Sequence, residues 1–144
     1  MTLKPFGGAL LIAATAFLGS EAPQDVPPAT ALAQAEARWR ERGPKTYQYQ
    51  IAITCFCPPF LNDRVRVTNG VPDPVKGLDG FNSVEKLFER IRQAISRGQY
   101  RISVKYDEQL GYPRSADLDP RREVKDDELY FVVRSFRPNT AGLR

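Results

Sequence analysis

The chain has 144 residues, of which 42% are hydrophobic and 26% charged, and its formal net charge is +4 at pH 7. These fractions lie near the averages for folded proteins, so they exclude a disordered or collagen-like chain, and the length suits one domain better than two. Histidine is absent and there are 2 cysteines, which excludes histidine-dependent catalytic triads, histidine zinc sites and a disulfide-dense scaffold.

The first 22 residues predict an export signal. Lys4 precedes an apolar run over residues 9–18, and Ser20-Glu21-Ala22 has the small-x-small pattern that signal peptidase accepts. The run is too short to cross a bilayer as a helix, and Ser20 stands where a bacterial lipobox has its lipidated cysteine. We therefore expect an exported protein, periplasmic or secreted, that is soluble rather than lipid-anchored and has no membrane span.

Three further segments follow the predicted signal. Residues 23–30 are rich in proline and are expected to form a tether, residues 31–137 a single domain, and residues 138–144 a flexible tail. No internal repeat divides the domain.

The domain is expected to begin with a helix over residues 31–42. In this segment Leu32, Ala35 and Trp39 fall on one helical face, and Gly43-Pro44 ends it. Trp39 is predicted to anchor the helix to a sheet.

Two strands are expected next. Residues 46–55 alternate, so that tyrosine, isoleucine and cysteine side chains share one face of a half-buried strand. Residues 64–68 form the second, with the valines pointing inward and Arg64 and Arg66 outward. Asn69-Gly70 predicts a tight turn with positive φ after it.

A second helix is expected over residues 82–97. Asn82 is its predicted N-cap, with Glu85 three residues later as in a capping box, and Gly98 is its predicted stop. One helical face gathers Val84, Leu87, Phe88, Ile91 and Ile95.

Three more strands are expected, over residues 101–106, 114–119 and 129–136. The last is apolar on both faces, which is typical of a strand in the middle of a sheet. Short connections favour antiparallel pairing with helices on one side. The predicted fold class is α+β in the order α-β-β-α-β-β-β, an antiparallel sheet of about four to five strands with two helices packed on one face. The other face stays open, and open faces bind partners.

Cys55 and Cys57 are the most unusual feature. In a flat strand their Cβ atoms lie about 6–7 Å apart, whereas a disulfide needs about 3.8 Å, so a bridge requires the chain to bend at Phe56. In an oxidising compartment we expect a small, strained disulfide that closes the strand end. A redox-active pair and a thiolate pair for a soft metal such as Cu(I) are the alternatives.

Four tyrosines, Tyr47, Tyr49, Tyr106 and Tyr112, are a candidate interaction surface, because tyrosine is enriched at protein interfaces. The alternative is that these rings lie at the edge of the core.

Carboxylates gather over residues 117–128. Asp117 and Asp119 would point the same way on a strand, as paired carboxylates do in acid/base and calcium sites. Arg121-Arg122 interrupts the run, which also lacks the ligand spacing of an EF-hand. We therefore expect a solvated turn with local salt bridges, and predict no metal, no cofactor and no catalytic residue.

Arginine accounts for fifteen of the 21 basic residues. These arginines are interleaved with acids, as over residues 36–42 and 85–90, which predicts a solvated surface. A nucleic-acid site needs a face of one sign with aromatic platforms, so no nucleic-acid partner is expected.

A set of short motifs runs in order through residues 31–136. It comprises Trp39, Tyr47-Gln48-Tyr49, Cys55-Phe56-Cys57-Pro58, Asn69-Gly70, Ser83-Val84-Glu85-Lys86-Leu87-Phe88, Tyr106-Asp107, Gly111-Tyr112-Pro113, Asp119 and Tyr130-Phe131-Val132-Val133. The ordered set resembles a bacterial exported family known as domain-of-unknown-function family 6174. The resemblance implies no reaction and no catalytic residues.

The favoured function is that of an exported, non-enzymatic module. It is expected to bind a protein or a cell-envelope component through the open sheet face or the tyrosine-rich edge. The alternative is a thiol-disulfide or copper protein that acts through Cys55 and Cys57. A hydrolase that uses Asp117 and Asp119 is a third hypothesis, and it requires a cleft around them.

Overall fold

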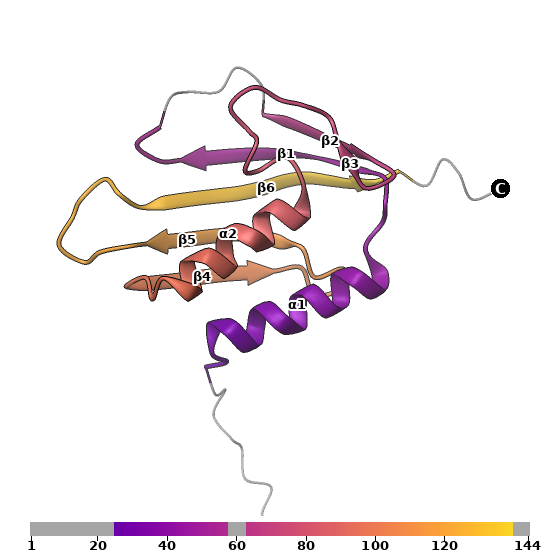
Figure 1. The fold of residues 1–144 in the computed structure, drawn as a ribbon. Helices are drawn as coiled ribbons and strands as arrows, with labels where there is room; N and C mark the ends of the chain where they lie inside the picture. The colour runs from indigo at the N-terminus through magenta and orange to yellow at the C-terminus, as the bar shows by residue number, and fades with distance from the viewer. Residues whose placement is uncertain (1–24, 58–62, 140–144) are drawn as a thin grey trace, which may run out of the picture.

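Two helices lie on one face of a six-stranded antiparallel sheet in the computed structural model of the chain, which describes residues 25–57 and 63–139 (Figure 1). The helices are α1 (Pro28–Arg42) and α2 (Val84–Ser96). This arrangement confirms the α+β class and the placement of both helices. The predicted export signal over residues 1–22 lies outside the described residues. No helix within them has the length and apolar character needed to cross a bilayer.

The strands follow the chain as β1 (Tyr47–Thr54), β2 (Arg64–Thr68), β3 (Val71–Pro72), β4 (Arg101–Tyr106), β5 (Pro113–Asp119) and β6 (Leu129–Pro138). Across the sheet their order is β3-β2-β1-β6-β5-β4. The position of β6 between β1 and β5 confirms the central place that its two apolar faces predicted. The sheet has one strand more than the four to five expected, because β3 forms after the turn at Asn69 and Gly70. Strand β3 has only two residues, one of them a proline, so its sequence has no alternating pattern from which a strand could be predicted.

Helix α1 begins at Pro28 rather than at residue 31. Proline is favoured in the first turn of a helix, where its missing N–H has no partner to lose, so the helix takes the last three residues of the segment expected to be a tether. The predicted inward face is confirmed, because Leu32, Ala35 and Trp39 are all buried. Gly43 ends the helix and donates its N–H to the Trp39 carbonyl.

Helix α2 is capped by Ser83, not by Asn82. The Ser83 hydroxyl accepts a hydrogen bond from the Lys86 N–H at 3.2 Å, as an N-cap does. Glu85 is therefore not at the third helical position that a capping box requires. Its carboxylate instead accepts a hydrogen bond from the Trp39 indole at 2.8 Å.

The core fills the layer between the helices and the sheet. Its buried strand residues are Tyr47, Tyr49, Ile51, Val65, Val67, Ala116, Leu118, Phe131 and Val133. Its buried helix residues are Leu32, Ala35, Trp39, Val84, Leu87, Phe88, Ile91 and Ala94. Five rings form what we call the aromatic cluster, which comprises Trp39, Tyr47, Tyr49, Tyr112 and Phe136. The Tyr112 and Phe136 rings stack at 4.3 Å between centroids. The cluster lies under β1 and the end of β6.

Candidate functional site: the open face of the sheet

The face of the sheet that the helices leave uncovered carries a group of arginines and glutamines. Along β1, Gln48 and Gln50 alternate with buried tyrosines and therefore point to the open face. Strand pairing places Gln48 between Arg66 of β2 and Arg137 of β6. It places Gln50 between Arg64 of β2 and Arg134 of β6. We call these six residues the arginine face.

A β-bulge in β6 brings Arg134 and Arg137 to the same side of the sheet. Gln50 pairs with Arg134 but Gln48 pairs with Arg137, so β6 has one extra residue in this interval. Ser135 in the bulge has φ of 51°. Phe131 and Val133 face the core, and strict alternation would turn Arg137 inward as well. The extra residue instead packs Phe136 against the core and leaves Arg137 exposed.

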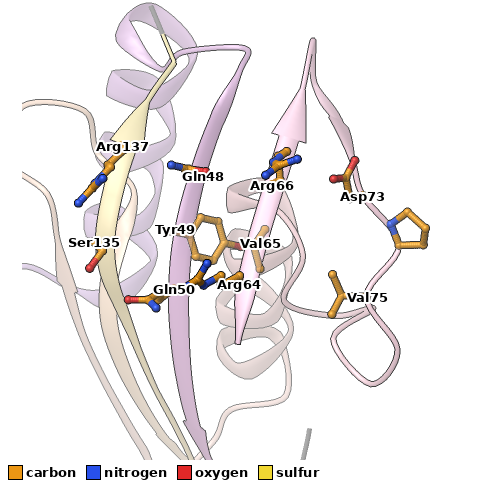
Figure 2. A pocket seen from close by; sticks show the side chains of 11 residues that line it. Gln48, Tyr49, Gln50, Arg64, Val65, Arg66, Asp73, Val75, Ser135 and Arg137 are labelled. Carbon is orange, nitrogen blue, oxygen red and sulfur yellow. The ribbon is translucent and has the colours of Figure 1, made fainter. Parts of the chain in front are cut away.

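A hollow of about 570 Å³ lies at the arginine face. Figure 2 shows the side chains around it on three neighbouring strands, with Asp73 beside Arg66 on the segment that follows β3. That segment is held to β2 by a hydrogen bond from the Asp73 N–H to the Arg66 carbonyl at 2.9 Å. Asp73, Pro74 and Val75 bound the hollow on this side, and Ser135 and Arg137 bound it on the β6 side.

The arginine face carries more positive than negative charge. Its four arginine side chains are exposed, and the one carboxylate among the described residues that line the hollow is that of Asp73. Within residues 25–57 and 63–139, Arg66, Arg134 and Arg137 form no ion pair. Guanidinium groups that form no ion pair favour an incoming anion, because their planar N–H forks match carboxylate and phosphate oxygens.

The predicted pair of carboxylates lies on the same face of the sheet but at its other side. Asp117 and Asp119 of β5 both face Arg101 of β4, whose guanidinium lies 3.4 Å from Asp117 and 3.7 Å from Asp119. Arg101 therefore pairs with both groups, so neither Asp117 nor Asp119 is poised as a free general base.

Asp119 also contributes to an acidic group with Asp127 and Glu128, whose nearest oxygens lie within 4.8 Å of one another. Arg121 pairs with Asp127 at 2.9 Å, and Arg101 pairs with Asp119. Because two of the three carboxylates have a guanidinium partner, the geometry assigns no metal ion to this group.

The four tyrosines predicted as an interaction surface lie on the helix side of the sheet. Tyr47 and Tyr49 are each only 2% exposed, so they belong to the core, and Tyr106 and Tyr112 are half-buried against it. Burial raises the pKa of all four phenols above its ordinary value. The alternation of β1 indicates which residues share a face, but it does not indicate that the helices cover that face.

The hydroxyl groups of two tyrosines attach β1 to the start of α2. The Tyr49 hydroxyl donates to the Phe81 carbonyl at 2.6 Å. The Tyr47 hydroxyl donates to Glu85 at 3.2 Å and accepts from the Val84 N–H at 3.0 Å. The role of these two rings is therefore to hold the helix layer against the strand that carries Gln48 and Gln50.

Cys55 and Cys57 are joined by a disulfide immediately after β1. The chain bends between them, with their Cα atoms 5.2 Å apart, and the Phe56 side chain is 94% exposed at the bend. Pro58 and Pro59, which follow the pair, lie outside the described residues. The redox and copper alternatives stay predictions.

Sequence reasoning did not identify the arginine face as a site. The alternation in β2 predicted that Arg64 and Arg66 point outward, and this is confirmed. No local signal places Arg134 and Arg137 beside them, because that proximity depends on the pairing of β1 with β6 and on the bulge at Ser135.

The chain belongs to a family of unknown function, DUF6174, whose model matches residues 31–138. This match confirms the resemblance found in the ordered motifs. The matched range includes all six residues of the arginine face and both cysteines. The chain matches no curated protein and no solved structure.

Proposed function

We propose that the protein is an exported, non-enzymatic module that binds its partner through the arginine face. The observation that carries the proposal is the group formed by Arg66, Arg134 and Arg137. All three side chains are exposed and have no ion-pair partner among the described residues, and Arg66 and Arg137 line the hollow.

The energetics of like charges support this role. Arginines gathered on neighbouring strands repel one another, which weakens the fold by a small amount in the free protein. A partner that brings negative charge removes this repulsion and forms charge-assisted hydrogen bonds. Clustered charge also increases the rate at which an oppositely charged partner associates.

The export part of the proposal rests on residues 1–22, with their basic start, short apolar run and small-x-small site. Export also favours the cysteine bridge, since disulfides persist in oxidising compartments.

One experiment tests binding in the cells that produce the protein. A photo-crosslinking residue is placed at Gln48 on the arginine face or, as a matched control, at Gln93, which is exposed on α2. We expect a discrete crosslinked adduct from position 48 and none from position 93. Equal adducts at both positions, or none at position 48, would contradict a binding role for this face.

Intact mass spectrometry of the same samples tests export. We expect the protein recovered outside the cytoplasm to have lost residues 1–22 and to begin at Pro23. An unprocessed chain that stays in the cytoplasm would contradict export without affecting the crosslinking result.

A further inference from the structure

We infer that the partner of the arginine face is an extended, acidic segment of a polypeptide. The inference rests on the proposed function and names the chemistry that the site recognises. The six side chains form two rows across three strands, Arg66-Gln48-Arg137 and Arg64-Gln50-Arg134. Each row thus has an arginine at either end and an amide in the middle.

The spacing of the arginines matches that of an extended peptide. Arg64 and Arg66 are two residues apart on β2, which separates their Cα atoms by about 6.5–7 Å. Alternate side chains of an extended peptide on the same side have this separation too. Carboxylates at alternate residues can therefore each meet one guanidinium of β2, while the residues between them face Arg134 and Arg137.

The middle of each row suits a peptide backbone. Gln48 and Gln50 lie between the arginines of β2 and those of β6. A glutamine amide donates and accepts hydrogen bonds, as the N–H and C=O groups of a main chain require. Adjacent strands are about 4.8 Å apart, so the two arginine columns are about 10 Å apart and leave room for one extended chain.

Other anionic partners fit this face less well. A bilayer is a plane of phosphates, whereas this site is a hollow bounded on one side by Asp73, Pro74 and Val75, which a flat layer of headgroups does not enter. Single-stranded nucleic acid binds by stacking bases on exposed aromatic rings. Among the described residues, the one aromatic residue that lines the hollow is Tyr49, which is 2% exposed.

The test measures binding of a fluorescent eight-residue peptide that alternates Glu and Thr to the full chain, by anisotropy at low ionic strength. The matched peptide carries Gln in place of each Glu. We expect the Glu peptide to bind at least tenfold more tightly than the Gln peptide, and the difference to shrink as salt is added.

Variants locate the binding. We expect Arg66→Glu, on the side that faces the Glu side chains, to weaken binding of the Glu peptide about tenfold. Arg137→Glu, on the side that faces the Thr side chains, should weaken it about threefold to fivefold through longer-range repulsion. Arg40→Glu, at an exposed position on α1, makes the same change in net charge and is expected to alter affinity less than threefold. Circular dichroism establishes that each variant is folded.

Several outcomes would overturn the inference. Equal losses in Arg40→Glu and Arg66→Glu would mean that net charge alone attracts the peptide. Tighter binding of polyphosphate or of phosphatidylglycerol vesicles would assign the face to phosphate groups. Concentration-dependent self-association lost in Arg66→Glu would assign it to a second copy of the chain. If the Glu peptide fails to bind while position 48 still crosslinks in cells, the acidic chemistry is wrong and the binding function stands.

Discussion

The two halves of the open face use the same residue type in opposite ways. In the β4–β5 half, Arg101 lies between two carboxylates, Asp117 and Asp119, and its charge is balanced within the sheet. In the half formed by β2, β1 and β6, four arginines surround two neutral glutamines. The first half resembles an ordinary solvated surface, where exposed ion pairs contribute little to stability. The net charge of +4 therefore does not reveal the local excess of positive charge on β2, β1 and β6, which becomes apparent only from the strand pairing.

The halves also differ beneath the sheet. The arginine half lies over the aromatic cluster, and tyrosine hydroxyl groups join its strand β1 to α2. The β4–β5 half lies mainly over aliphatic and small residues, such as Ile102, Val104 and Leu118. Stacked rings and buried hydrogen bonds hold the backbone of the arginine half in one position. A rigid backbone keeps the arginine spacing fixed, which lowers the cost of binding an extended ligand.

The largest expected effect comes from a side chain that opposes the backbone conformation of the bulge in β6. Ser135→Val places a β-branched residue at a φ of 51°, where such residues are strongly disfavoured. The strand then either keeps the bulge under strain or loses it, and by strict alternation the loss turns Phe136 to the open face and Arg137 to the core. Either outcome should lower the free energy of unfolding by at least about 2 kcal/mol. Urea unfolding followed by circular dichroism measures this loss.

Ser135→Gly is the matched control, because it changes the same position to a residue that favours positive φ. Glycine adopts the φ of 51° at this position without the strain of a side chain, so stability should stay equal or rise by up to about 1 kcal/mol. Equal stability of the valine and glycine variants would contradict the conclusion that the backbone conformation at Ser135 sets the facing of Phe136 and Arg137.

An intermediate effect is expected from the layer beneath the arginine half. Tyr49→Phe leaves the Phe81 carbonyl without its hydrogen bond and should lower the free energy of unfolding by about 1–2 kcal/mol. Tyr130→Phe, on an exposed ring of the open face, is the control and should change stability by less than about 0.5 kcal/mol. Equal effects of the two substitutions would contradict a structural role for the buried hydroxyl.

The same layer predicts a loss of stability in alkali. Burial raises the pKa of Tyr47 and Tyr49 above its ordinary value, so these phenols stay neutral in the folded state when unfolded tyrosines, with a pKa of about 10, ionise. The stability that the two buried neutral phenols contribute is fully present below pH about 10 and is lost as the pH rises further. Unfolding midpoints measured between pH 8 and 12 should fall less steeply for Tyr49→Phe than for the unaltered chain.

The smallest expected effect comes from a substitution that tests the difference in charge between the two halves of the open face. Gln50→Glu places a carboxylate between Arg64 and Arg134 and makes the arginine half resemble the β4–β5 half. We expect stability to rise by about 0.5 kcal/mol and affinity for the acidic peptide to fall severalfold. Gln93→Glu on α2 is the control for affinity, which it should leave unchanged. A Gln50→Glu variant that gains no stability and binds as before would contradict the charge imbalance of this half.

Local patterns predicted most of the fold, because alternation and helical spacing are properties of neighbouring residues. They placed both helices, five of the six strands and the inward positions of Trp39 and Phe88. They failed where the outcome depends on competition between two suitable neighbouring residues or on the pairing of strands far apart in the sequence. Asn82 and Ser83 are both good N-caps, and only packing selects Ser83. The arginine face needs residues from three strands and the extra residue Ser135, which no short window of sequence contains.

Trp39 gives the protein an intrinsic fluorescence that reports on a single position. It is the single tryptophan of the chain, it is 7% exposed, and its ring meets Tyr47 edge-to-face at 5.3 Å. Its emission therefore comes from one place, the junction of α1 with the underside of the arginine half. Unfolding should move this emission to longer wavelength as the indole enters water. A ligand that shifts β1 should change its intensity, so binding can be followed without a label.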